Sequence, residues 1–143
     1  MHAIRHVIYP HKLVTAPPSA SVLEVARIMT DAKVGAIPIV EGARLVGIFS
    51  ERDLMTRVIV AGRDAQKTLV GEAMTHELVT AAPDDTRSEC LERMRGARCR
   101  HLPVLEDGRL IAMLSMRDLL RDEIEEQGEE IRGLRAYLHQ TPS

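Results

Sequence analysis

The sequence predicts a mixed α/β (α+β) fold of two tandem β-α-β-β-α units, related by a pseudo-twofold axis and followed by a helical extension. Three observations predict it. The 143-residue chain repeats itself at a constant offset of 65 positions, so that 13–54 matches 78–119. Within each repeat, the spacing of apolar residues changes between strand and helix periods in the same order. An apolar stripe at helical spacing then continues beyond the second repeat.

The two repeats align without a gap, and 16 of the 42 aligned positions are identical. A unit of three short strands and two helices is too small to bury enough apolar surface alone. We therefore expect the two units to pack sheet to sheet around a shared core. The expected boundaries are 7–62 for the first unit, 63–125 for the linker with the second unit, and 126–143 for the helical tail.

The first unit is expected to begin with a short strand, LVT, followed by a turn rich in proline and serine. Ser21 then opens a helix, because Glu24 completes a capping-box pattern and apolar residues recur three and four positions apart. The runs AIPIV and RLVGIFS indicate two strands joined by a tight turn at 41–43. Ser50 begins a second helix.

The second unit repeats this order, with HLPVL and RLIAMLS as its strand pair and Ser115 opening its second helix. Gly62 to Thr68 is polar and is expected to link the units, and Leu69 to Met74 is expected to form a short lead-in helix to the second unit. The two cysteines fall in a predicted helix and strand, so a disulfide framework is not expected. The chain has no CxxC motif, and no metal site is predicted.

Composition excludes several classes of function. The formal charge of −2 offers no general attraction to nucleic acid or to an anionic membrane. No apolar run approaches the roughly 20 residues that span a bilayer, and the start lacks the apolar segment of a signal peptide, which predicts a cytoplasmic protein. The chain has no P-loop and no G-x-G-x-x-G fingerprint, so an enzyme is not expected. With three aromatic residues in all, any slot for a base must be aliphatic.

The motif Ser-x-Arg-Asp-Leu occurs twice, at 50–54 and 115–119, each time after an apolar strand. One interpretation is a helix cap, in which serine accepts a bond from an orphan N–H and aspartate favours the positive end of the helix. That interpretation leaves Arg52 and Arg117 unexplained, because a cation is unfavourable in the first turn. Free N–H groups, a hydroxyl, a guanidinium and a carboxylate together suit a nucleotide. Two such helix starts predict two candidate pockets.

These duplicated motifs resemble the cystathionine β-synthase (CBS) domain, and the pair resembles a Bateman module, over about residues 7 to 125. The resemblance rests on the repeated β-α-β-β-α order, the strand ending Gly-h-h-Ser-x-x-Asp and the upstream h-Pro-h-h. It implies a regulatory module that needs no cofactor and binds AMP, ADP, ATP, NAD or S-adenosylmethionine in clefts between the repeats. It also implies a homodimer in which two modules form a flat disc, and a downstream protein target that the sequence does not name.

The resemblance also assigns roles to individual residues. It implies that Asp53 and Asp118 hold the ribose, and that ribose or phosphate is met by Ser50, Arg52, Ser115 and Arg117. The segments that would line the base or reach phosphates contain Val34, Gly35, Ile37, Pro38, Cys99, Arg100, His101 and Pro103, with Lys12 as a further candidate.

The two repeats differ at the phosphate end. The first has Gly35 and Ala36 where the second has Arg100 and His101, so we expect phosphate binding to be unequal. Ala112 replaces the glycine of the motif in the second unit. One bound nucleotide per chain, at micromolar affinity, is therefore as compatible with the sequence as two. Arg100 and His101 are equally compatible with a solvated strand end.

The tail continues the last helix with a narrow apolar stripe at 4-3-4-3-4 spacing: Leu120, Ile124, Gln127, Ile131, Leu134 and Leu138. This stripe either packs on its own domain or forms a seam with a second chain, with Gln127 fixing the register. Gly128 and Gly133 weaken the helix, so the tail needs a partner surface. The alternative to a nucleotide sensor is a ligand-free dimerisation scaffold in which the Ser-x-Arg-Asp motifs only cap helices.

Overall fold

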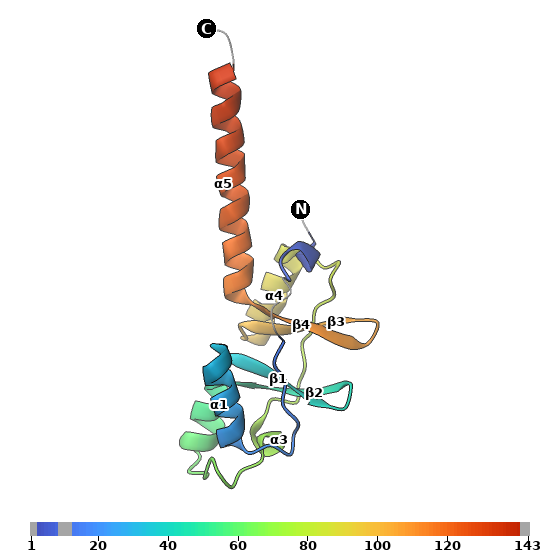
Figure 1. Cartoon of the computed structure of the whole chain (residues 1–143), viewed down its shortest axis with the longest axis vertical. Coiled ribbons are helices and arrows are strands. Elements are labelled where there is room, and N and C mark those ends of the chain that lie inside the picture. Colours follow the sequence, from blue (N-terminus) through green and yellow to red (C-terminus); the bar gives the residue numbers. More distant parts are fainter. Residues whose placement is uncertain (1–2, 9–12, 141–143) are drawn as a thin grey trace.

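The computed structural model describes residues 3–8 and 13–140, and it has the mixed α+β architecture that the sequence predicts (Figure 1). The first unit contains α1, β1, β2, α2 and the π-helical η2, and the second contains α4, β3, β4 and α5. A 3-10 turn, η1, precedes the first unit, and the short helix α3 lies between the units. The bounds are η1 Ile4–His6, α1 Val22–Ala32, β1 Ala36–Glu41, β2 Arg44–Ser50, α2 Glu51–Asp53, η2 Leu54–Ile59, α3 Val70–Ala73, α4 Arg87–Ala97, β3 His101–Glu106, β4 Arg109–Ser115 and α5 Met116–Gln140.

Each unit has an antiparallel hairpin, β1 with β2 and β3 with β4. The strand predicted at the start of each unit is reduced to one parallel bridge, from Ala16 to Ile39 and from Ala81 to Val104. Prolines explain why the ladder is so short. The next rung on either side needs an N–H from residue 18 or residue 38, both of which are proline, and residues 83 and 103 repeat this in the second unit. The predicted three-stranded sheet is therefore a hairpin with one bridged residue beside it.

The helices α1 and α4 begin and end in the same way. The Ser21 hydroxyl accepts a bond from the Glu24 N–H at 3.1 Å, and Thr86 forms a reciprocal capping box with Glu89. Both helices end at a basic residue in the left-handed conformation, Lys33 with φ 58° and Arg98 with φ 55°. The chain turns there into the first strand of each hairpin, β1 or β3.

The buried side chains form two clusters, one in each unit, instead of the shared core that the sequence suggested. The strands β2 and β4 contact each other between the units. Helix α3 is present, but it packs on the first unit, where Val70 and Ala73 are fully buried. The N-terminal turn packs instead on the second unit through Ile4 and Val7. Each core is therefore completed by a segment from outside its own repeat.

Helix α3 and the N-terminal turn are attached by equivalent backbone hydrogen bonds. The Val70 N–H donates to the Ala20 carbonyl and the Ile4 N–H donates to the Asp85 carbonyl, both at 2.8 Å. Ala20 and Asp85 are themselves 65 positions apart. The sequence did not reveal this arrangement, because the two segments share no aligned motif.

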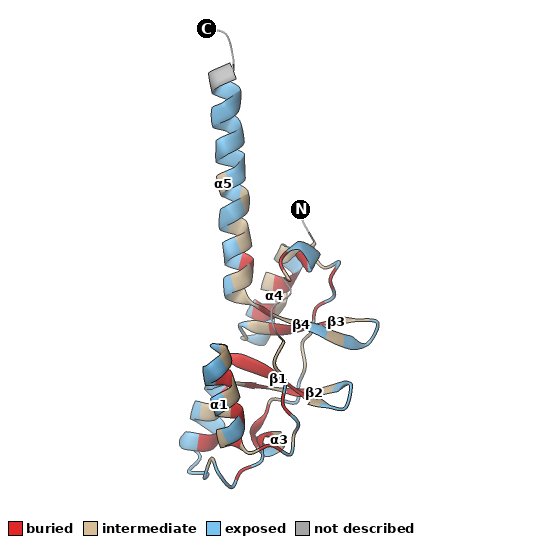
Figure 2. Cartoon of the chain, viewed as in Figure 1, coloured by how far each residue is buried: buried red, intermediate tan, exposed pale blue. Residues whose placement is uncertain are grey.

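Helix α5 runs well beyond the rest of the chain (Figure 1). Figure 2 shows most of its projecting part as exposed. At its base, Arg87 of α4 forms ion pairs with Asp122 at 2.8 Å and Glu126 at 2.7 Å. These bonds attach α5 to the second unit. Within the described residues, no helix is both long enough and apolar enough to cross a bilayer.

Candidate functional site

A cleft of about 1640 Å³ lies between the two units. Its walls come from the C-terminal half of α1, the start of β1, the start of β3, the end of β4 and the first turns of α5. Both units therefore contribute to it. Eight of the residues predicted for the ligand site line this cleft: Val34, Gly35, Pro38, Arg100, His101, Ser115, Arg117 and Asp118.

The start of α5 presents the second Ser-x-Arg-Asp motif to the cleft. The Ser115 N–H donates to Asp118 Oδ2 at 3.0 Å, and the Asp118 N–H donates to Ser115 Oγ at 3.1 Å. Asp118 is half-buried. Only the first of these bonds uses the carboxylate, through Oδ2, and within the described part of the chain no hydrogen bond to Oδ1 is found. The capping interpretation and a ligand role are thus compatible at this helix.

Four basic residues line the cleft, and the sequence reasoning found two of them. Arg100 and Arg117 were predicted, whereas Lys33 and Arg121 were not. Arg121 follows Arg117 by four positions, so both lie on one face of α5, and this spacing could have identified it. Lys33 reaches the cleft because α1 ends there in a left-handed residue. Cations beside a helix N-terminus favour a bound anion.

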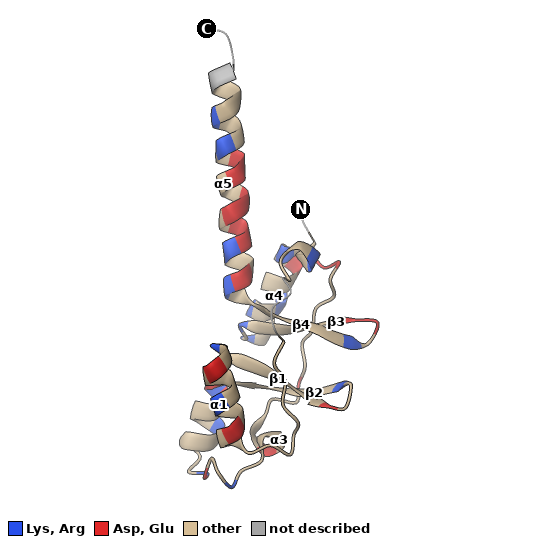
Figure 3. Cartoon of the chain, viewed as in Figure 1, with Lys and Arg blue, Asp and Glu red and all other residues tan. Residues whose placement is uncertain are grey.

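Acidic groups in the same wall keep the cleft from being uniformly positive. Glu51, Asp118 and Glu125 line it together with the basic residues. Figure 3 shows both signs of charge at the base of α5. Such a mixture fits a ligand that carries hydroxyl donors as well as negative charge.

His101 is half-buried at the start of β3. Its burial lowers the pKa of the imidazole below the ordinary value, and the charge of Arg100 acts in the same direction. Asp118 and Glu51 oppose this shift. The side chain is therefore neutral near pH 7 in the free protein.

Only some of the residues predicted to line the base belong to the apolar wall of the cleft. Because side chains alternate along a strand, Ala36 and Pro38 line the cleft while Ile37 is fully buried in the first core. Further apolar lining comes from α1, β4 and the second helices, which the sequence did not single out: Met29, Leu54, Met113 and Met116. Cys99 and Pro103 are not among the lining residues, and Lys12 lies outside the described residues.

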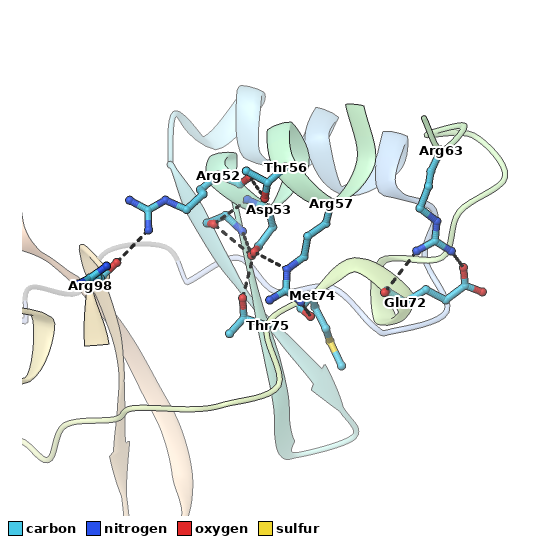
Figure 4. Close-up of polar contacts among 10 residues, drawn as sticks. Arg52, Asp53, Thr56, Arg57, Arg63, Glu72, Met74, Thr75 and Arg98 are labelled. Atoms are coloured by element: carbon cyan, nitrogen blue, oxygen red, sulfur yellow. Dashed lines mark hydrogen bonds and ion pairs between the residues drawn. The ribbon is translucent and has the colours of Figure 1, made fainter. Parts of the chain in front are cut away.

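The first Ser-x-Arg-Asp motif is differently placed: Glu51 and Leu54 line the cleft, but Ser50, Arg52 and Asp53 do not. Figure 4 shows the contacts that Arg52 and Asp53 make instead. Asp53 is 5% exposed. Its Oδ2 accepts from the Ser50 N–H at 3.0 Å and the Ser50 hydroxyl at 3.1 Å. Its Oδ1 accepts from the Thr75 hydroxyl at 3.0 Å and pairs with Arg57 Nε at 3.5 Å. Both oxygens of this carboxylate are therefore bonded within the protein.

Three further contacts between residues distant in the sequence complete this arrangement. Arg52 donates to the Arg98 carbonyl of the other unit at 3.2 Å (Figure 4). Thr75 is held by paired backbone bonds to Ile48, which place it beside β2. The preceding Met74 packs against Gly47, where a Cβ atom would clash with its side chain. The segment after α3 thus covers the helix start at Ser50, which the sequence predicted to form one of two pockets.

Comparison with known proteins gives a consistent result. The family model of the CBS domain matches residues 4–60 and 70–125. The mitochondrial CBS domain-containing protein CBSX3 of Arabidopsis thaliana is 37% identical over 123 residues, which cover 82% of this chain and 60% of the relative. The CBS domain-containing protein YhcV of Bacillus subtilis is 33% identical over 108 residues, covering 76% of each chain. The chain thus spans less than two thirds of the length of the first of these relatives.

Solved structures agree with this match. The crystal structure of a CBS domain superposes with a TM-score of 0.83 and 32% identity, and it covers 87% of this chain and 99% of its own. Two neighbours of similar fold contain ligands. One is a CBS domain pair in complex with 5′-methylthioadenosine and S-adenosyl-L-methionine, with 23% identity and a TM-score of 0.78. The other is CBSX2 in complex with AMP, with 21% identity and a TM-score of 0.75.

Proposed function

Since this chain belongs to the CBS-domain family and contains a tandem pair of the domains, we propose that it is a regulatory module that binds one adenosine-containing ligand. The site is the cleft between the units, and the ligand is AMP, ADP, ATP or NAD. The observation that carries this proposal is the grouping of Asp118, four basic side chains and an aliphatic wall in one cleft. Occupancy is read by a partner protein.

Each part of the ligand has a matching wall. The adenine packs between aliphatic side chains such as Val34 and Pro38, where burying about 100 Å² contributes roughly 2 to 3 kcal/mol gross. The ribose hydroxyls donate to Oδ1 of Asp118. The phosphates lie at the start of α5, near Arg117 and Arg121. Charge-assisted bonds of about 1.5 to 3 kcal/mol each give micromolar affinity after the cost of association.

We propose one ligand per chain. A ribose needs a carboxylate with a free acceptor, and both oxygens of Asp53 are already bonded to Ser50, Thr75 and Arg57. Asp118 keeps one oxygen for the cleft. The grouping of cations in the same cleft supports a ligand with a phosphate over a neutral nucleoside.

A ligand can regulate the protein because both units supply walls of the cleft. Val34 and Pro38 belong to the first unit, whereas Arg100 and Asp118 belong to the second. A ligand that contacts both units favours the arrangement in which they are held together. It therefore shifts the population of shapes that a partner meets.

One observation favours the alternative of a ligand-free scaffold. Both serine and aspartate pairs form capping boxes, so each motif has a structural role without any ligand. The cap does not account for Arg100, Arg117, Arg121 and Lys33 around one cavity. We therefore retain the scaffold as the outcome of a failed binding test.

The test is isothermal titration calorimetry with AMP, ATP and NAD on the wild type, Asp118→Asn and the matched Asp53→Asn. We expect one site per chain in the wild type and a loss of roughly tenfold or more in Asp118→Asn, since a charge-assisted bond to ribose is removed. Asp53→Asn should leave the affinity of the folded protein unchanged, with folding checked by circular dichroism. No heat with any of the three ligands leaves the scaffold, whereas equal binding by Asp118→Asn removes the assignment of the ribose to Asp118.

A further inference from the structure

An exposed apolar stripe runs along α5 from its base into its projecting part. Five of its six members are exposed hydrophobic side chains, and these range from 45% exposed at Leu120 to 69% exposed at Leu138. Ion pairs with Arg87 attach the helix to its own unit through Asp122 and Glu126. Leu120 and Ile124, at the base of the helix, also line the cleft between the units. Beyond that base, α5 extends away from both units (Figure 2).

The spacing of the stripe fixes a heptad register along α5. A step of four residues leads from d to a, and a step of three leads from a to d, which leaves one assignment. The a positions are Ile124, Ile131 and Leu138, and the d positions are Leu120, Gln127 and Leu134. In this register Asp122 and Glu126 fall at f and c. The side that binds Arg87 is therefore opposite to the stripe.

The residue types at a and d identify the kind of partner. In a parallel coiled coil, isoleucine at a with leucine at d favours two strands, and two of the three residues at each of these positions fit that pattern. Gln127 interrupts this pattern at a central d position. In a parallel, in-register pair it meets the Gln127 of the other chain, and the two amides can bond to each other. In an antiparallel pair it would lie against isoleucine instead.

The charged residues beside the stripe also favour parallel pairing, independently of the residues at a and d. The charged residues at e are Arg121 and Arg135, with Gly128 between them, and those at g are Glu123 and Glu130, followed by Tyr137. A parallel pair brings g of one chain to e of the other, which joins Glu130 to Arg135 on both sides of the seam. An antiparallel pair brings g to g and e to e, so that glutamate meets glutamate and arginine meets arginine. Opposite signs at e and g therefore select parallel pairing.

We propose that α5 pairs with α5 of a second copy of this chain as a parallel, in-register two-stranded coiled coil from Leu120 to Leu138. The stripe is short, and Gly128 sits at an e position, so the pairing is reversible and depends on concentration. Both modules then lie at the same end of the coil. This proposal does not depend on the ligand, and its tests use the full chain without added nucleotide.

The orientation is tested by disulfide formation in Leu134→Cys under mild oxidation. In the parallel pair position 134 faces its own copy, so we expect a covalent dimer. In an antiparallel pair with all six layers matched, position 134 faces position 124 instead. The matched control is Ala136→Cys at the f position, which carries the same native cysteines. No dimer from Leu134→Cys, or equal dimer from the control, overturns the proposal.

The charges are tested by sedimentation equilibrium of Arg135→Glu. We expect the dimer dissociation constant to rise roughly tenfold at low salt, because two attractive pairs become repulsive, with a smaller effect at high salt. Exchanging both signs, with Glu130→Arg and Arg135→Glu together, should restore the dimer. Arg132→Glu at the b position makes the same charge change outside the seam. A monomeric wild type at about 100 μM, or equal effects of the Arg135 and Arg132 variants, contradicts the pairing.

Discussion

The two Ser-x-Arg-Asp motifs are written alike, but the folded chain uses them differently. At the first, Asp53 is buried, and its oxygens accept bonds from Ser50 and Thr75. At the second, Asp118 is half-buried and lines a cleft between the units. A duplicated motif therefore does not imply a duplicated site. At the first motif, the segment after α3 lies over the helix start and bonds to Asp53.

The covering element at the first motif is the segment after α3. Its backbone bonds to Ile48 place Thr75 within 3.0 Å of Asp53 Oδ1. The corresponding segment of the second unit follows the N-terminal turn, where the counterpart of Thr75 lies outside the described residues. The helices differ as well, because the first ends at Ile59 whereas α5 continues to Gln140. We infer that the first motif mainly stabilises the fold and that the second mainly binds.

The largest effect expected from this comparison is on folding stability. Asp53→Ala removes the acceptor for Thr75, Ser50 and Arg57 in a buried position, and we expect a loss of about 3 kcal/mol in the free energy of unfolding. Asp118→Ala removes the acceptor for the Ser115 N–H in a capping box at a half-exposed position, with an expected loss of about 1 kcal/mol. Urea denaturation of both variants measures the two values. Equal losses would show that the two aspartates have the same structural role.

The next effect concerns phosphate binding. Arg100→Ala removes a cation from the cleft, and we expect affinity for ATP to fall roughly tenfold while affinity for adenosine changes little. Arg52→Ala is the matched control, because Arg52 bonds to the Arg98 carbonyl instead of lining the cleft. Calorimetry with both ligands makes the comparison. A larger loss in Arg52→Ala than in Arg100→Ala would place the phosphates at the first motif.

Much of the fold was predictable because its signals are local. The cap at Ser21, the strand pairs and the helix starts at Ser50 and Ser115 each depend on residues within one turn or one hairpin. The choice between the two candidate pockets was not predictable, because it depends on Thr75, which lies 22 positions from Asp53. Lys33 was missed for a similar reason, since its place depends on the left-handed end of α1.

Thr75→Val removes one bond from the segment after α3 but keeps the Asp53 carboxylate, so we expect a smaller effect on stability. The valine has a similar shape but donates no hydrogen bond to Asp53 Oδ1, and we expect a stability loss of about 1 kcal/mol. Arg57 and Ser50 still hold the carboxylate, so the number of ligands per chain should stay at one. Calorimetric stoichiometry with NAD tests this. Two ligands per chain in this variant would show that Thr75 alone closes the first pocket.

The smallest effect is a pH dependence that only the second unit can show, because the residue equivalent to His101 in the first unit is Ala36. Burial lowers the pKa of His101 in the free protein, with Arg100 acting in the same direction and Asp118 and Glu51 opposing them. A bound pyrophosphate favours the imidazolium and raises this pKa. Affinity should therefore rise severalfold as the pH falls from about 7.5 through the window between the bound and free pKa values.

NAD is the ligand for this measurement, because its pyrophosphate keeps its charge across that range, whereas the terminal phosphate of AMP titrates near pH 6. The same lowered pKa means that protonation of His101 is less favourable in the folded protein than in the unfolded chain. The stability that the neutral His101 contributes is therefore lost as the pH falls below the pKa of the unfolded chain, about 6.5. Affinity is therefore measured only where circular dichroism shows a folded chain. His101→Gln should flatten the profile. A profile that keeps its slope in this variant would mean that another group takes up the proton and that the phosphates lie away from β3.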